Sequence, residues 1–297
     1  MKYTVKNNLI EVEVETKGAE MMRITSLPDR KEYLSDGNPK YWSRRSPVLF
    51  PVVGLAKDKK IVVDGQEYPM AQHGFARDSA FEVIEQTEST LLLEMSSDED
   101  TRKCYPYDFK LQIGYELDGA DITVRWKVIN TGDKEMHYQI GAHPAFCCPV
   151  DSDLEKQSQY FMKFDGAETI SYRLLDEDGL VAPEKYELAT EGGLYAIPET
   201  MFDRGALIIE GSQNHTVSLC RPDKKPYVTV KFDAPLYGVW SPIKLNAPFI
   251  CIEPWHGRAD NSDFAGEIQD RDYDQALPSG ETKEYVYTIC VEDVLNC

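Results

Sequence analysis

The segment FKLQIGYELDGADITVRWKVIN, residues 109–130, decides the fold class. Apolar residues take every second position from Phe109 to Leu117, with lysine, glutamine, glycine and glutamate between them. After an Asp-Gly pair the alternation resumes and runs from Ile122 to Val128. A period of two is typical of a β-strand that has one face in the core and one face in water. The segment therefore predicts an antiparallel hairpin.

The same alternation recurs along the chain. Residues 10–14, 228–232 and 285–291 each place apolar side chains at every second position. Turn pairs that contain glycine separate such segments, for example at 64–65 and 279–280. No stretch sustains an apolar stripe at helical spacing over three turns, so we expect few helices, all of them short. These patterns predict an all-β, antiparallel protein with two large sheets packed face to face.

Length and charge bound the possible functions. The chain has 297 residues and no proline-rich linker, so we expect a single domain over residues 1–297. Its net charge of −19 repels phosphate backbones and anionic lipids, so neither nucleic acid nor a membrane is an expected partner. No run approaches the roughly 20 apolar residues that span a bilayer, and the N-terminal segment lacks the apolar core of a signal peptide. A cytoplasmic location is therefore expected.

Candidate site residues are polar groups set in apolar or glycine- and proline-rich surroundings. In an all-β protein a sheet face or a barrel mouth is the expected place for a small-molecule site. Four segments have this character: YWSRRSPVLFPVVG (41–54), QHGFARD (72–78), IGAHPAF (140–146) and FICIEPWHGRAD (249–260).

His143 is the first candidate. Gly141 and Ala142 leave open space beside the imidazole, and Pro144 restrains the backbone after it. Such a ring is held in place and can be reached by a ligand. The structural alternative is a half-buried histidine that is hydrogen-bonded to a carbonyl group.

Glu253 is the second candidate, at the end of the apolar segment 249–252. An isolated buried carboxylate is costly, so it needs a hydrogen-bonding partner or a ligand. Desolvation raises the pKa of a carboxyl group, which would suit this one to act as a general base. The alternative is a salt bridge to an arginine such as Arg44 or Arg77.

Basic groups accompany these two residues. His73 precedes Gly74, which lets a ligand approach closely, and Arg77 follows the histidine by four residues. Arg44 and Arg45 precede an apolar segment with a proline at each end. A guanidinium group stays charged and offers five donors in a rigid fork, so arginines that enter such a segment usually bind something. The alternative, for either Arg44 or Arg45, is a position on the surface beside a strand with no ligand to bind.

Metal and nucleophilic chemistry have little support. Neither an HxH nor an HExxH spacing occurs around His73, His143 or His256, and the seven cysteines show no CxxC spacing. A GxSxG elbow and a phosphate-binding glycine loop are absent as well. We therefore expect no metal and no cofactor. An imidazole acid and a carboxylate base beside a small polar ligand remain.

Six motifs occur in a fixed order along the chain. They are KGAEMMRITS (17–26), WSRRSPVLFP (42–51), HGFAR (73–77), GAHPAF (141–146), CIEPWHG (251–257) and LPSGET (277–282). In this order, on an all-β chain of this length, they resemble the aldose 1-epimerase family of galactose mutarotase-like proteins, especially its LacX-like branch. The resemblance spans nearly the whole chain.

The resemblance implies a fold and a set of site residues. The family's fold is an antiparallel β-supersandwich in one domain. His143 matches the family's catalytic acid, Glu253 matches its catalytic base, and His73 matches a second histidine that binds the sugar. Arg44 aligns with a substrate-binding arginine, although Arg45 lies one position away. Further candidates for contact with the sugar are Arg77, Trp255 and Asp203.

The implied function is that of a cofactor-independent isomerase, an aldose 1-epimerase or mutarotase. Glu253 would remove the proton of the anomeric hydroxyl while His143 donates a proton to the ring oxygen, which opens the ring. Rotation about the C1–C2 bond exposes the other carbonyl face, and the pair, with roles reversed, closes the ring to the opposite anomer. The expected partner is a hexose, or a hexose 6-phosphate held by arginines, and the expected assembly is a monomer or homodimer.

Two other functions stay open. A non-catalytic carbohydrate-binding protein on the same scaffold would use Trp42, Trp240 and Trp255 to stack on sugar faces. A metal-dependent enzyme of the cupin type would contain bound metal. An acid and a base on opposite sides of the sugar ring distinguish the isomerase from the binding protein.

Overall fold

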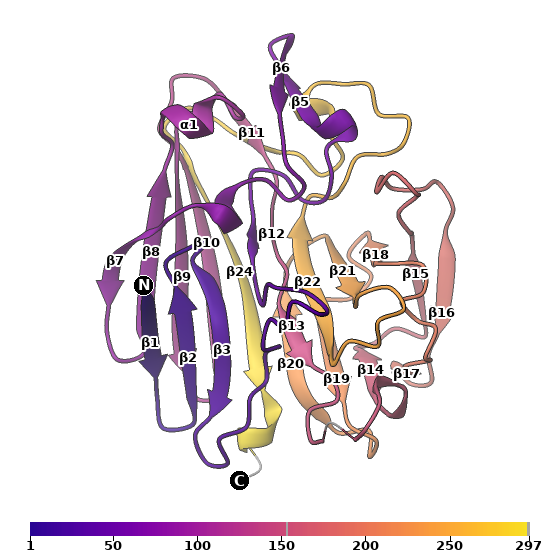
Figure 1. Ribbon diagram of the computed structural model, residues 1–297. Helices are drawn as coiled ribbons and strands as arrows, with labels where there is room; N and C mark the ends of the chain where they lie inside the picture. Colours follow the sequence, from indigo (N-terminus) through magenta and orange to yellow (C-terminus); the bar gives the residue numbers. More distant parts are fainter. Residues whose placement is uncertain (153, 296–297) are drawn as a thin grey trace.

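The computed structural model describes residues 1–152 and 154–295 and has an all-β, layered architecture (Figure 1). The rear layer is a nine-stranded antiparallel sheet. In spatial order its strands are β17 (Leu194–Ala196), β14 (Phe161–Phe164), β19 (Thr216–Cys220), β20 (Pro226–Phe232), β24 (Thr282–Val291), β10 (Asp121–Asn130), β9 (Phe109–Asp118), β8 (Thr90–Ser96) and β7 (Glu82–Gln86).

Two smaller sheets lie side by side in front of the large one (Figure 1). One contains β1 (Lys2–Lys6), β2 (Ile10–Glu15) and β3 (Glu20–Ser26). The other contains β18 (Leu207–Glu210), β21 (Leu236–Trp240), β22 (Phe249–His256), β12 (Ile140–Ala142) and β4 (Val48–Leu49), and β13 (Ala145–Cys147) also pairs with β22. Two-stranded pairs complete the fold: β5 (Lys60–Val63) with β6 (Gln66–Pro69), β11 (Met136–Tyr138) with β23 (Gln275–Leu277), and β15 (Thr169–Tyr172) with β16 (Tyr186–Ala189).

The hairpin predicted over residues 109–130 is confirmed. Strands β9 and β10 pair antiparallel from Asp118–Asp121 at the turn to Phe109–Asn130 at the open end. The alternating apolar residues Phe109–Leu117 and Ile122–Val128 are buried, and the residues between them are partly or fully exposed. The two large sheets expected from the sequence are instead one large sheet faced by two smaller ones. Strand alternation reports burial on one face, but it carries no information about where a sheet ends.

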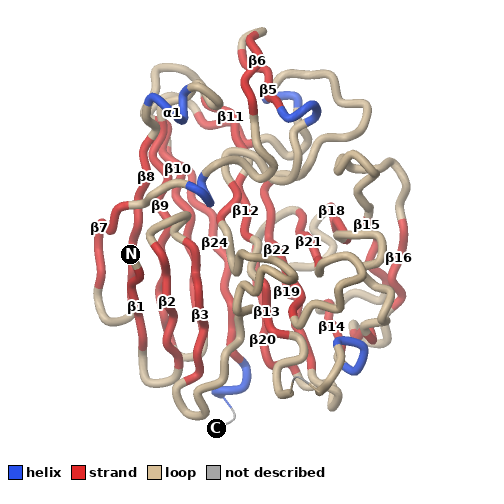
Figure 2. The backbone as a smooth tube through the Cα atoms, viewed as in Figure 1, coloured by secondary structure: helices blue, strands red, loops and turns tan. Residues whose placement is uncertain are grey.

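Helices are scarce in the part of the chain that the structure describes (Figure 2). The α-helix α1 (Glu99–Arg102) is one turn long, and the Asp98 side chain caps it by accepting from the backbone N–H of Thr101. Short 3₁₀ turns occupy Lys57–Lys59, Ala76–Asp78, Gln157–Gln159, Ile268–Asp270 and Glu292–Leu295. None of these helices, within the described residues, has the length and apolar character needed to cross a bilayer.

The core lies between the layers. One cluster of buried side chains joins Val12 of β2, Ile113 of β9, Val230 of β20 and Ile252 of β22. The large sheet therefore packs against both smaller sheets at once. This leaves the opposite, outward face of β22 free to form the floor of a site.

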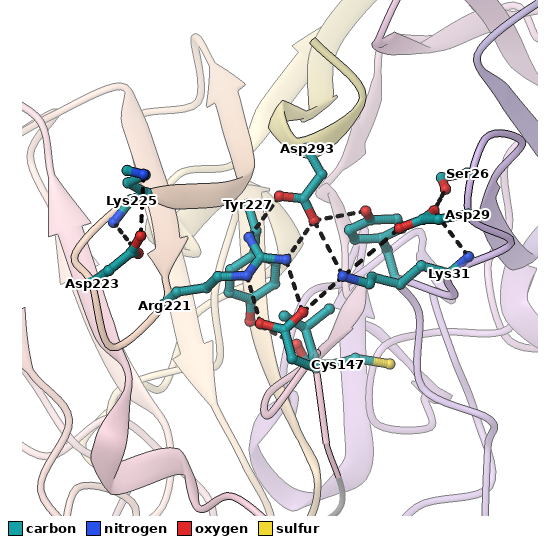
Figure 3. Close-up of polar contacts among 12 residues, drawn as sticks. Ser26, Asp29, Lys31, Cys147, Arg221, Asp223, Lys225, Tyr227 and Asp293 are labelled. Carbon is teal, nitrogen blue, oxygen red and sulfur yellow. Dashed lines mark hydrogen bonds and ion pairs between the residues drawn. The ribbon is translucent and has the colours of Figure 1, made fainter. Parts of the chain in front are cut away.

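A network of charged side chains fastens the C-terminal 3₁₀ turn to the rest of the fold (Figure 3). Arg221, between β19 and β20, donates to both carboxylate oxygens of Asp293 at 2.6 Å and to Asp151. Lys31, after β3, also donates to Asp151. None of these residues lines the cavity described below. We therefore assign this network to the architecture of the protein.

Candidate active site

Strand pairing brings His143 opposite Glu253. On either side of His143, β12 and β13 pair with β22 in one continuous register, in which Gly141 is opposite Trp255 and Ala145 is opposite Cys251. His143 is two residues after Gly141, and Glu253 is two residues before Trp255. The same register therefore places His143 opposite Glu253. Because residues at alternate positions share a face, both side chains lie on the outward face of the sheet.

The two functional groups are in contact and buried. His143 Nε2 lies 3.1 Å from Glu253 Oε2. His143 is 7% exposed and Glu253 is 1% exposed. Among the described residues no donor forms a hydrogen bond to Glu253 Oε2, and His143 Nδ1 is likewise without a side-chain or backbone partner. Such buried polar atoms need a partner, which a bound water or a small polar ligand would supply.

Burial disfavours the charged form of both groups. It raises the pKa of Glu253 well above the ordinary value of 4.5. Burial also lowers the pKa of His143 to about 3, and the charges of Arg77 and Arg44 act in the same direction. Burial therefore favours a protonated carboxyl beside a neutral imidazole over the charged pair. Such displaced pKa values are typical of catalytic acids and bases.

The raised pKa of Glu253 makes stability depend on pH. In the unfolded chain this carboxyl ionises near its ordinary pKa of 4.5, whereas the buried group keeps its proton to higher pH. Rising pH above that value therefore favours the unfolded chain, by up to about 1.4 kcal/mol per pH unit. Glu253→Gln cannot ionise in either state. Thermal melts from about pH 5 to about pH 8 should show the variant gaining stability relative to the parent, and a constant difference would contradict this expectation.

His73 is held as a hydrogen-bond donor toward the cavity. Its Nδ1 accepts from the backbone N–H of Gly54 at 3.0 Å, and its own backbone N–H donates to the Gly54 carbonyl at 2.8 Å. Because Nδ1 is an acceptor, the proton of the neutral ring is on Nε2. Burial keeps the ring neutral by lowering its pKa well below the ordinary value. His73 therefore offers one N–H to a ligand oxygen, and its sugar-binding role stays a prediction.

Gly54 is required for this contact. Its φ is +71°, and a Cβ there would lie 2.5 Å from the backbone nitrogen of Ala259. We expect Gly54→Ala to lower the free energy of unfolding by roughly 1–3 kcal/mol for overpacking, beyond the cost of the strained φ. The matched control is Gly65→Ala, where φ is +76° and nothing lies within 4 Å of the added Cβ. Equal losses for the two variants in denaturant titrations would contradict the packing argument.

The pair opens into a cavity of about 400 Å³, within the size range of small-molecule sites. Three tryptophans, Trp42, Trp240 and Trp255, line it. The rings of Trp42 and His143 lie 4.6 Å apart, centroid to centroid. The Trp255 ring packs directly against the glycines of the two neighbouring strands. A Cβ at Gly141 or Gly238 would come within 2.6 Å of the ring. Flat aromatic walls around polar groups suit the apolar faces of a sugar ring.

Charged groups at the cavity rim come mainly from loops. Arg77, predicted from the sequence, lines the cavity, and its guanidinium donates to the carbonyl of Gln72. Asp176 and Glu177, from the loop between β15 and β16, and Arg204, just before β18, also line it. Sequence analysis missed these three residues. Their signal was only an Asp-Gly turn and an exposed arginine, which occur in many loops.

Two of the predicted substrate contacts, Arg44 and Asp203, are not among the residues that line the cavity. The Arg44 guanidinium donates to the Asp78 carboxylate and to the Arg77 carbonyl, and Arg44 is not among the residues that line the cavity. Asp203 does not line it either, whereas the next residue, Arg204, does. His256, whose role the sequence left open, packs on Tyr285 with ring centroids 4.3 Å apart. The structure thus brings together His143, Glu253, His73, Arg77 and Trp255.

One group of possible metal ligands among the described residues is compact. The ligand atoms of His143, Cys251 and Glu253 all lie within 4.8 Å of one another, and all three residues are buried. The set combines an imidazole, a thiol and a carboxyl group, which is a combination that zinc accepts.

Comparison with known sequences gives one family. The family model described as aldose 1-epimerase matches residues 1–270. The plasmid and chromosomal forms of protein LacX from Lactococcus lactis subsp. lactis are each 27% identical to the chain over 302 residues. Each alignment covers 98% of this chain and 99% of the relative.

Solved structures agree with this result. A galactose mutarotase related enzyme from Lactobacillus acidophilus is 31% identical, with a TM-score of 0.92 over 98% of this chain and 97% of its own. A galactose mutarotase-like protein from Lactobacillus casei ATCC 334 is 25% identical, with a TM-score of 0.90 over 98% of this chain and 99% of its own. The antiparallel galactose mutarotase-like fold predicted from the sequence is therefore confirmed.

Proposed function

The chain belongs to the aldose 1-epimerase family, which supports a mutarotase-type function, and we propose that it interconverts the α and β anomers of a hexose. The observation that carries this proposal is the pairing of His143 with Glu253. Their functional atoms lie 3.1 Å apart at the edge of a cavity that three tryptophans line. A protein that only bound sugar would have no use for an imidazole and a carboxyl group buried in contact with each other at this point.

The reaction needs one proton removed and one proton added. Glu253 in its carboxylate form takes the proton of the anomeric hydroxyl while the His143 imidazolium donates to the ring oxygen, which opens the hemiacetal. After rotation about the C1–C2 bond, protonated Glu253 returns its proton to the carbonyl oxygen and neutral His143 accepts one from the C5 hydroxyl. The pair ends in its starting state, so each turnover leaves the enzyme's proton count unchanged.

The resting protonation state fits this cycle. The protonated carboxyl and neutral imidazole favoured by burial carry the same number of protons as the carboxylate and imidazolium that open the ring. Passage of one proton across the 3.1 Å contact interconverts the two forms. Hydroxyl groups of a bound sugar supply hydrogen bonds to the charged form, which burial otherwise disfavours. Substrate binding thereby prepares the pair for ring opening.

We propose an unphosphorylated hexose as the substrate. The cavity lining contains two arginines, Arg77 and Arg204, and two carboxylates besides Glu253, those of Asp176 and Glu177. Arg204 is also anchored, since it donates to the Tyr186 hydroxyl and stacks on the Tyr186 ring. Cations that are balanced in this way do not form a site for a dianion. His73 and the rim carboxylates instead provide both donors and acceptors for sugar hydroxyls.

The test is direct measurement of anomer interconversion. Freshly dissolved α-glucose, α-galactose and α-glucose 6-phosphate are followed by polarimetry or NMR, with the uncatalysed rate subtracted. We expect acceleration for at least one neutral hexose and a smaller effect on the phosphate. If none of the three sugars equilibrates faster with the protein than without it, the proposal is wrong. Faster turnover of the phosphate would reverse the substrate assignment while keeping the reaction.

A further inference from the structure

Cys251 lies beside the catalytic pair but has no part in the reaction proposed above. It precedes Glu253 by two positions on β22, so its side chain points to the same face of the sheet. The register sets it opposite Ala145, two residues from His143 on the neighbouring strand. The thiol is free and Cys251 is fully buried. A thiol, an imidazole and a carboxyl group therefore meet at one point.

The spacing of the three ligand atoms is close to that of a tetrahedral zinc site. Zinc bonds of about 2.0–2.3 Å place neighbouring ligand atoms roughly 3.3–3.6 Å apart. The contact between His143 Nε2 and Glu253 Oε2, at 3.1 Å, already has nearly this length. All three ligand atoms lie within 4.8 Å of one another, so the sulfur needs to approach by roughly 1.5 Å at most.

The ligand atoms are not engaged elsewhere. Glu253 Oε2 is buried and accepts no hydrogen bond from the described residues. His73, whose ring centroid is 5.7 Å from that of His143, is not a fourth ligand, because its Nδ1 accepts from Gly54 and its Nε2 therefore carries the proton. His143 and Glu253 both line the cavity, so a water there could serve as a fourth ligand. Three protein ligands and one open position are typical of an accessible zinc site.

We propose that His143, Cys251 and Glu253 form a binding site for Zn²⁺, and that zinc bound there inhibits the enzyme. As the metal binds, the thiol and the carboxyl group each release a proton to solvent, and the two anions balance the charge of the cation. Zinc then occupies the lone pair of His143 and the oxygen of Glu253 that would act on the sugar. The inhibitory part of the proposal rests on the function proposed above, whereas the binding site does not.

The ligand set also predicts selectivity. Mg²⁺ and Ca²⁺ prefer cages of oxygen ligands, whereas a thiolate and an imidazole favour zinc and similar transition metals. The chain's net charge of −19 raises the local concentration of any cation, so charge alone cannot distinguish these ions. We therefore expect Zn²⁺ to bind and inhibit at concentrations at which Mg²⁺ does neither.

The first test measures binding without reference to activity. The full-length protein, freed of metal with a chelator and then of the chelator, is titrated with ZnCl₂ in a calorimeter, and in parallel with CoCl₂ while its absorption spectrum is recorded. We expect one tight site and a thiolate-to-cobalt charge-transfer band. Cys251→Ala should remove the band and weaken zinc binding by at least about 100-fold. Loss of an outer-shell partner costs up to that factor, and loss of a direct ligand should cost no less. Cys251→Ser serves if the alanine variant folds poorly, and Cys220→Ala, at another fully buried cysteine, should leave both signals unchanged.

The second test joins binding to the reaction. Anomer interconversion is measured with EDTA, with ZnCl₂ and with MgCl₂, each against its own protein-free rate. The parent should be active in EDTA and inhibited by zinc, and Cys251→Ala should be active in both. Equal zinc affinity in the parent and Cys251→Ala would overturn the site, and activation by zinc would overturn the inhibition. If the protein shows no activity in EDTA or zinc, the proposed function fails, but calorimetry still decides whether the zinc site exists.

Discussion

Glu253→Gln is expected to slow anomer interconversion by about 10²- to 10⁴-fold, the usual contribution of a general base. The amide has nearly the size and shape of the carboxyl group, but it cannot accept the anomeric proton at neutral pH. Because burial favours the uncharged form of Glu253, the uncharged amide suits the same surroundings. The loss should therefore fall on the chemical step, while the cavity stays intact.

The measurement is the rate of polarimetric change for the fastest hexose, with thermal melting as the check on folding. Glu20→Gln is a matched control, because Glu20 is also buried and accepts hydrogen bonds from the backbone of Arg45 and Ser46, which an amide oxygen can still accept. We expect this control to retain the parental rate. A rate for Glu253→Gln within a few-fold of the parent would remove Glu253 from the mechanism.

Local patterns were sufficient to predict the strands. The alternation in residues 109–130 corresponds to β9 and β10, and residues 10–14 and 285–291 fall within β2 and β24. These strands are recognisable because each has one buried and one exposed face. Strand β22 was harder to interpret, since seven of its eight residues are buried and the pattern does not alternate. What marked this segment was the carboxylate of Glu253, which follows four apolar residues and which an ordinary buried strand has no reason to contain.

The meeting of His143 and Glu253 does not follow from the local sequence. It depends on β12 and β13 pairing with β22, and on the register that sets Gly141 opposite Trp255. A shift of one residue would turn one of the two side chains into the core. Within the sequence, only the resemblance to a known family indicates that the two residues act together.

Arginine positions were the weakest part of the site prediction. Arg44 and Arg45 share the same sequence signal, yet Arg44 binds Asp78 and Arg45 donates to the Met22 carbonyl. Arg204, which does line the cavity, is in a loop without any periodic pattern. A long, flexible cation takes its direction from the partners within reach, and those partners come from distant segments of the chain.

His143→Asn is expected to cause a loss of the same order, about 10²- to 10⁴-fold, because the ring oxygen must receive a proton as the C1–O5 bond breaks. Asparagine keeps a polar group in the cavity but cannot be protonated near neutral pH. His256→Asn is the matched control. That histidine is on β22 next to Trp255, but its ring packs on Tyr285 and does not line the cavity. We expect the control to retain the parental rate.

The double variant His143→Asn with Glu253→Gln tests whether the two groups act as a unit. If each proton transfer requires the other, removal of the first group already abolishes the benefit of the second, and the double variant should be no more than a few-fold slower than the slower single variant. Independent groups would instead give losses that multiply, to about 10⁴-fold or more. The 3.1 Å contact argues for the first outcome, because two ionisable groups this close titrate as a pair. Polarimetry of all four proteins under one condition decides the question, and multiplicative losses would show that His143 and Glu253 work separately.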